Sequence, residues 1–116
     1  MNQPAMMPTE VSVGIGKYPS SALDGPRIAL AEALVRARAL EAGLAYELIA
    51  ARADLSAIVC GARSGNHEPD VRTLRGWRRE LVGDELLALL AGERTIAVAG
   101  DGQLAITATP AAEPQP

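Results

Sequence analysis

The sequence lacks phenylalanine, has only three aromatic residues and carries one cysteine, Cys60, among its 116 residues. A single cysteine excludes an internal disulfide framework and is typical of a reducing cytoplasm, where we expect this chain to reside. We interpret Cys60 as a small buried apolar residue. No apolar run approaches the roughly 20 residues of a transmembrane helix. The first residues include no basic segment followed by an apolar core, so we expect neither a signal peptide nor a membrane contact.

Lysine is also scarce, because ten of the eleven basic residues are arginine. Fourteen acidic residues outnumber the basic ones and give a formal net charge of −3. A dedicated nucleic-acid-binding protein usually carries a basic excess, so such binding would here depend on a local patch. Apolar residues make up 48% of the chain, and alanine and leucine, the best helix formers, dominate them. The length allows one small domain, and the composition favours an all-α fold.

The two ends of the chain differ in composition from its middle. Residues 1–22 contain Pro, Gly and Ser with little periodicity, and we expect a flexible N-terminal arm in which residues 11–15 alternate like a short strand. Residues 108–116 are rich in Pro and Ala and are expected to form a disordered tail. The folded domain is therefore predicted at residues 23–107.

The first predicted helix begins at Asp24 or Gly25, with Pro26 at a position where its missing N–H is not needed. Gly43 is a natural end for this helix. Six apolar residues at helical spacing mark the face that we expect to pack into the core: Leu30, Ala33, Leu34, Ala37, Leu40 and Leu44.

Three further helical segments are predicted, at residues 46–51, 53–61 and 76–91. The last is the most apolar, and we expect it to be central and contacted from several sides. Gly83 interrupts it and predicts a local bend. The polar residues 62–69 are expected to form a loop, followed by a turn or short helix over residues 69–74.

Beyond residue 92 the apolar period changes from helical to alternating. Residues 95–98 and 103–107 are strand candidates, and the Gly100-Asp101-Gly102 segment between them is a hairpin-turn signal. We predict a short C-terminal β-hairpin over residues 95–107. Four side chains are expected to pack it against the helices: Ile96, Val98, Leu104 and Ile106.

The sequence offers little support for catalysis. Two-metal hydrolysis needs clustered carboxylates, and the chain contains no Asp-x-Glu pair. His67-Glu68-Pro69-Asp70 resembles a metal cluster, but it has one histidine and no second group of ligands, so we interpret it as a polar loop. Gly14-x-Gly16-Lys17 is too short for a phosphate-binding loop. We therefore predict no catalytic residue, no metal site and no cofactor.

Positive charge gathers in one stretch. Residues 63–79 contain five arginines and two acids, a local charge of +3 in a chain of net −3. If a short helix before Arg75 continued into the next one, Arg72, Arg75 and Arg79 would share one face, and arginine forks suit phosphate groups. The alternative is that these arginines pair with acids such as Glu80 and Asp84. Both interpretations stay open at this point.

Two motifs resemble those of a known family. The segment Leu48-Ile49-Ala50-Ala51-Arg52-Ala53-Asp54-Leu55 is similar to L-L-A-S-R-x-D-L, and Leu74-x-Gly76-Trp77-Arg78-x-Glu80-Leu81 is similar to L-x-G-W-R-x-E-L. Together with the apolar run from Leu86 to Gly92, they resemble the C-terminal part of bacterial ribonuclease D. That part holds helicase-and-RNase-D-C-terminal (HRDC) domains, and the resemblance covers about two-thirds of the chain.

The resemblance implies a compact bundle of about five helices that helps to hold RNA. Ribonuclease D trims RNA 3′ ends, including those of tRNA precursors, with metal bound by four acidic residues of which this chain shows no trace. It therefore implies a non-catalytic accessory domain whose partners are RNA (tRNA or single-stranded 3′ ends), an exonuclease domain or another protein. A protein-interaction module without nucleic-acid binding is the alternative, and an independent enzyme is a third.

The resemblance also assigns roles within the second motif. Gly76, Trp77 and Leu81 would build the bundle, with Trp77 as the helix anchor and Gly76 as a close-approach residue. Arginines around them would face the nucleic acid, and the candidates are Arg72, Arg75, Arg78 and Arg79.

Overall fold

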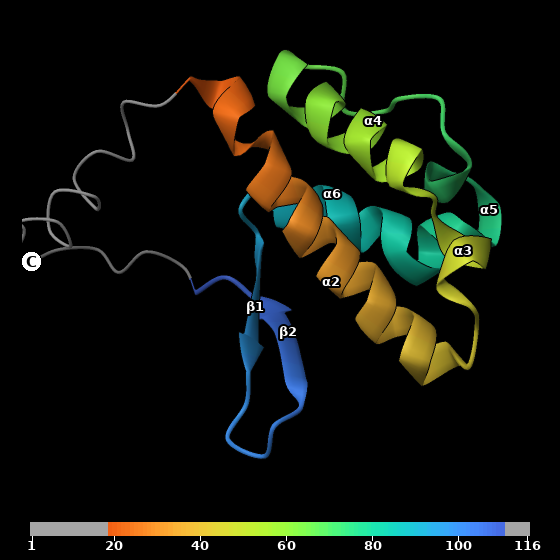
Figure 1. Cartoon of the computed structure of the whole chain (residues 1–116), viewed down its shortest axis with the longest axis vertical. Helices are drawn as coiled ribbons and strands as arrows, with labels where there is room; N and C mark the ends of the chain where they lie inside the picture. The colour runs from red at the N-terminus through yellow and green to blue at the C-terminus, as the bar shows by residue number, and fades with distance from the viewer. Residues whose placement is uncertain (1–18, 111–116) are drawn as a thin grey trace, which may run out of the picture.

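The computed structural model describes residues 19–110 (Figure 1). The predicted short strand, most of the predicted arm and residues 111–116 of the predicted tail lie outside this part. Within it, no helix has the length and apolar character that crossing a membrane would require. Its elements, in chain order, are the 3-10 turn η3 (Ser20–Leu23), α2 (Asp24–Ala42), α3 (Tyr46–Ile49), α4 (Arg52–Ser64), the 3-10 turn η4 (Arg72–Leu74), α5 (Gly76–Arg78), the π turn η5 (Arg79–Gly83), α6 (Asp84–Leu90), β1 (Arg94–Val98) and β2 (Leu104–Ala108).

The described residues are mostly helical and end in a two-stranded hairpin, as the composition and the change of period predicted. Figure 1 shows α2 crossing the middle of the molecule, with α4 beside it and α6 behind it. The α5–η5 segment leads into α6, and the hairpin lies beside α2. The core lies where these helices meet, and its fully buried large side chains are Leu34, Val35, Ile49, Leu55, Ile58, Val59, Val82 and Leu86.

The start and end of α2 are close to those predicted, but the prediction of its buried face is wrong. Of the six residues predicted to face the core, only Leu34 is buried, and Leu40 is 84% exposed. The side chains that enter the core come from the opposite side of the helix: Ile28, Ala31, Val35 and Ala39. Because alanine and leucine occur on both sides of α2, the apolar pattern does not distinguish the two faces. Branched Ile28 and Val35 beside small alanines instead fit the close contact with α4.

Two carboxylates accept hydrogen bonds at the first turns of α2 and α4. The Asp54 carboxylate accepts a 2.8 Å hydrogen bond from the Ala51 N–H, which satisfies a donor at the beginning of α4. Asp24, in the first turn of α2, accepts hydrogen bonds of 3.0 and 3.1 Å from Arg63 on α4. The Cys60 thiol donates to the same carboxylate at 3.7 Å. Cys60 is thus half-buried at a polar contact, which corrects the prediction of a buried apolar residue.

The segment from Gly76 to Leu90 is helical throughout, as predicted, and it departs from α geometry in the turn that ends at Gly83. Arg79–Gly83 forms a π turn, after which α6 starts at Asp84 with regular helical angles. A Cβ atom on Gly83 would lie 2.7 Å from the carbonyl oxygen of Thr73 and 3.2 Å from Leu74. Glycine is therefore needed where this helix crosses the backbone of η4. The Thr73 hydroxyl in turn donates to the Ile49 carbonyl at 3.2 Å and is fully buried.

The predicted hairpin is confirmed, with β1 and β2 pairing antiparallel from Arg94 opposite Ala108 to Val98 opposite Leu104. Ile96 and Ile106 face each other and pack against the core. Val98 and Leu104, at the far end of the hairpin, are exposed. The expected packing against the helices is therefore right for the first pair and wrong for the second, whose side chains stay largely open to solvent.

An ion pair joins α2 to α6. Arg38 donates two hydrogen bonds to the Glu85 carboxylate, at 2.7 and 2.8 Å, and both side chains are largely shielded from water. The hydrogen bonds from Arg38 lower the pKa of Glu85 below its ordinary value. The two helices are thus held together by a paired charge beside the apolar core.

We predict that Gly83→Ala lowers the stability of the fold by about 1–3 kcal/mol, because a methyl group there displaces the Thr73 carbonyl. Thermal unfolding should show it, at roughly 4–8 °C per kcal/mol for a domain of this size. Gly25→Ala is the control, since a Cβ on that helical glycine meets no atom within 4 Å. Equal melting temperatures for the two variants would contradict the close approach.

We predict that Glu85→Gln reduces stability at neutral pH and that its deficit shrinks as the solution is acidified. The pKa of Glu85 is lower in the folded state, so its stabilising effect is present above the ordinary glutamate pKa of about 4.3 and is lost as the pH falls through the folded value. A pair of this exposure is worth on the order of 1 kcal/mol. Urea unfolding at several pH values measures the difference, and a pH-independent deficit would refute the charge-based account.

Candidate nucleic-acid interface

Of the four arginines proposed to bind nucleic acid, three lie on η4, α5 and η5 and Arg75 lies between η4 and α5, and they do not share one helical face. Arg75 separates η4 from α5 with extended backbone angles, φ −130° and ψ 146°. The short helix therefore does not continue into the long one, and the expected alignment of Arg72, Arg75 and Arg79 is wrong. Each side chain has a different set of contacts.

Arg79 is held inside the protein's own hydrogen-bond network. Its guanidinium donates to both oxygens of Glu68 at 2.6 and 2.9 Å, and to Asp84 at 2.7 Å. A fourth contact reaches the Leu74 carbonyl at 3.3 Å. These hydrogen bonds raise the pKa of Arg79 and lower that of Glu68. Arg79 thus ties the loop before η4 to the start of α6, and pairing with acids is the better interpretation for it.

Arg72 makes a similar internal link. Its Nε donates to Asp54 at 3.3 Å, and Nη2 donates to the Glu47 carbonyl at 2.9 Å. It connects η4 with α3 and with the beginning of α4. Like Arg79, Arg72 therefore serves to connect elements of the fold.

Arg75 is the most outward of the four. Its side chain is 64% exposed, and its salt-bridge partner at 3.0 Å, Asp70, is 88% exposed. Surface pairs of this kind contribute little and are screened by salt. A phosphate group could therefore replace Asp70 as the partner of Arg75 at small cost.

Trp77 does not anchor the core, contrary to the prediction, because its side chain is 47% exposed. Leu86, nine residues further along the same helical segment, is fully buried. Val82 and Leu86 fill the core from this segment, and Leu81, predicted to share in building the bundle, is half-buried against it. The tryptophan thus lies on the outer face of the long helix.

Gly76 also has a different role from the one predicted. A Cβ there would meet no atom within 4 Å, so the residue does not permit a close approach. Its φ of +58° is a conformation that side-chain-bearing residues rarely adopt. Gly76 allows the change of backbone direction with which α5 begins. The glycine that permits a close approach in this segment is Gly83.

Arg78 covers the outer tryptophan. Its guanidinium carbon lies 4.5 Å from the centroid of the Trp77 ring, a cation–π contact, and its Nε donates to the Leu48 carbonyl at 2.8 Å. Leu48 on α3 is itself 51% exposed. We call Arg75, Trp77, Arg78 and Leu48 the Trp77 surface. Leu48 opens the first of the two motifs, but nothing in the sequence links it to Arg78, and only the hydrogen bond between them places it on this surface.

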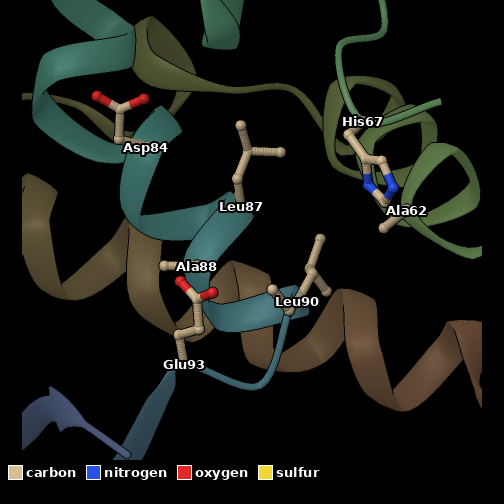
Figure 2. Close-up of a pocket in the computed structure, with 8 residues that line it drawn as sticks. Ala62, His67, Asp84, Leu87, Ala88, Leu90 and Glu93 are labelled. Carbon is tan, nitrogen blue, oxygen red and sulfur yellow. The ribbon is translucent and has the colours of Figure 1, made fainter. Parts of the chain in front are cut away.

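A separate cleft of about 350 Å³ lies between the end of α4 and α6 (Figure 2). Leu87 and Leu90 line it from α6, with His67 across from them on the loop that follows α4. Asp84 and Glu93 place carboxylates at its edge, which disfavours a phosphate ligand there. Among residues 19–110, no three histidine, cysteine or acidic side chains come together in a way that could hold a metal ion.

The chain is similar to part of ribonuclease D from three bacteria. The chain is 33% identical over 107 residues to ribonuclease D of Zymomonas mobilis, a match that covers 91% of this chain and 26% of that protein. It is 36% and 38% identical over 85 residues to the ribonucleases D of Granulibacter bethesdensis and Gluconacetobacter diazotrophicus, covering 73% of this chain and 19% of each. The chain thus matches a partial region of ribonuclease D and spans about a quarter or less of these relatives.

No family model matches the chain. No solved structure matches it either.

We predict that Trp77→Ala costs about 2 kcal/mol of stability or less, since the residue is about half exposed and loss of a fully buried tryptophan costs roughly 3–5 kcal/mol. Leu86→Ala, at a fully buried position of the same helix, is the comparison and should cost about 2–5 kcal/mol. Urea unfolding of both variants gives the two values. If Trp77→Ala were the more damaging change, Trp77 would be an anchor after all.

Proposed function

We propose that this chain is a non-catalytic accessory region of the ribonuclease D type that contacts RNA through the Trp77 surface. The similarity to part of three ribonucleases D supports the relationship. The mostly helical fold is compatible with an HRDC-like domain. We place its action in the cytoplasm, on tRNA or on single-stranded RNA 3′ ends, and assign it no catalytic residue.

The observation that carries the proposal is the half-exposed Trp77 ring with the Arg78 guanidinium over it. Unpaired RNA bases stack on aromatic rings and on guanidinium planes, and this stacking tolerates any base. Arg75 lies two residues away with only a solvent-exposed partner. The surface therefore combines a stacking platform with two cations that can meet phosphate groups.

The number of available cations bounds the strength of binding. Arg72 and Arg79 are paired with shielded or clustered carboxylates of the fold, whereas Arg78 donates to a backbone carbonyl and Arg75 has an exposed partner. Two of the four candidate arginines therefore remain for phosphate groups. Two phosphate contacts on a single strand give a slope of about −1.4 for the logarithm of the binding constant against that of salt concentration. Binding should be weak and should have a shallow salt dependence.

A second candidate function is a protein-interaction module that does not bind nucleic acid. Large apolar side chains exposed on the outer face of α2, led by Leu40, favour it. This surface is distinct from the Trp77 surface, so the two candidate functions can be tested with different variants.

We predict that Arg78→Glu weakens the binding of a fluorescently labelled single-stranded RNA by about tenfold or more, because it removes a cation and places a carboxylate beside the phosphates. Fluorescence anisotropy at several salt concentrations measures it. Arg94→Glu makes the same charge change on β1 and should leave the affinity almost unchanged.

Trp77 provides a second readout, because it is the only tryptophan in the chain. RNA that stacks on it should quench its intrinsic fluorescence along the same titration curve. The proposal fails if the RNA does not bind at micromolar protein, if binding ignores salt, or if Arg94→Glu weakens binding as much as Arg78→Glu.

A further inference from the structure

The outer face of α2 is apolar although it does not enter the core. Leu30 is 48% and Leu40 is 84% exposed, and Ala33 and Ala37 lie between them, half-buried. Leu44, just beyond the Gly43 cap, is exposed as well. A contiguous apolar stripe of this kind on a small domain marks an interaction surface.

The spacing of the stripe identifies the shape of what covers it. Residues 30, 33, 37 and 40 follow each other at intervals of three, four and three, which is the pattern of the apolar seam between two paired helices. At 100° per residue they fall within an arc of about 80°. The partner that fits such a narrow, straight seam is another α-helix.

The charges on either side of the seam indicate which helix packs against it. Arg36 flanks it on one side and Glu41 on the other, and both side chains are exposed. They are five residues apart, the spacing at which flanking residues of opposite charge meet across two parallel helices in register. A second α2 placed parallel to the first would therefore pair Arg36 of each copy with Glu41 of the other. An antiparallel copy would instead oppose like charges.

Both side chains keep their present contacts in such a pair. Arg36 lies 4.3 Å over the Tyr46 ring and Glu41 accepts from Arg38 at 2.9 Å. Neither contact uses the full capacity of the charged group, since a guanidinium has five donors and a carboxylate about four acceptor sites.

The hairpin adds to the same face. A groove of about 240 Å³ runs between α2 and the end of the hairpin. Ala37, Leu40 and Glu41 line it from α2, and Gly102, Gln103 and Leu104 line it from the hairpin. Figure 1 shows the hairpin lying alongside α2. The groove provides a recess of mixed polar and apolar lining next to the most exposed leucine, into which a side chain from a second helix can insert.

We propose that the outer face of α2 is the dimerisation surface of this chain, occupied by α2 of a second copy in parallel orientation. The interface consists of the Leu30–Leu40 seam, the recess beside Leu104 and two symmetric Arg36–Glu41 pairs. The helical seam is short, about 15 Å between its end residues, so the dimer forms at micromolar or higher concentration and dissociates on dilution.

Sedimentation velocity over a dilution series of the purified chain tests the proposal. The wild type should shift from monomer to twice the monomer mass as concentration rises. Leu40→Glu should raise the dimer dissociation constant on the order of 100-fold, because it places two carboxylates against each other at the seam. Leu48→Glu introduces the same charge at an exposed leucine outside the seam and should leave the dimer intact. Circular dichroism confirms that both variants fold.

A charge exchange tests the identity and the orientation of the partner. Arg36→Glu alone should weaken the dimer, because it opposes Glu41 of the other copy, and Arg36→Glu with Glu41→Arg should restore it. A wild type that stays monomeric at all concentrations overturns the proposal. So does equal dissociation by Leu48→Glu, or a failure of the double variant to recover.

Discussion

The arrangement of this fold depends on one close contact, the passage of Gly83 against the carbonyl of Thr73. Without a side chain at Gly83, the long C-terminal helix can cross η4 at a distance that any Cβ would prevent. Thr73 is fully buried there, and its hydroxyl is satisfied by the Ile49 carbonyl at the end of α3. The segments α3, η4 and η5 thus meet at one point, and the buried Thr73 hydroxyl is paired there rather than left without a partner. The π turn that ends at Gly83 is the local deviation that accompanies this crossing.

The same contact determines which side chains remain available on the surface. With η5 held against η4, Arg79 lies between Glu68, Asp84 and the Leu74 carbonyl and becomes an internal link. Val82 and Leu86 then occupy the core, and Trp77 lies on the outer face of the helix with Arg78 over its ring. The most conspicuous motif of the sequence therefore divides between two tasks. Its arginine in the π turn stabilises the fold, whereas its tryptophan and the arginine next to it form a surface.

Local signals predicted the elements well and their faces poorly. The hairpin could be predicted because strict alternation and a Gly-Asp-Gly turn define both its strands and its register. The exposure of Trp77 could not be predicted from spacing, because the π turn between Trp77 and Leu86 changes how the two side chains are oriented relative to each other. The buried face of α2 could not be predicted either, because alanine and leucine occur on both sides and only the contacts with α4 and α6 select one. The pairing of Arg72 and Arg79 was beyond the sequence for the same reason, since Asp54 and Glu68 approach them only through the fold.

The failure of the α2 prediction is itself informative. Helical periodicity correctly found a continuous apolar stripe, and the structure shows that the stripe faces outward while Ile28 and Val35 face the core. An apolar stripe that the monomer does not bury is explained most simply by a second helix that buries it, and the flanking Arg36 and Glu41 are complementary to the same pair on another copy. The stripe adjoins the hairpin, whereas the Trp77 surface lies at the α5 end of the long helix (Figure 1). Pairing through α2 would therefore leave both Trp77 surfaces open, and two linked weak sites hold one RNA strand more tightly than either site alone, provided that the strand can span them.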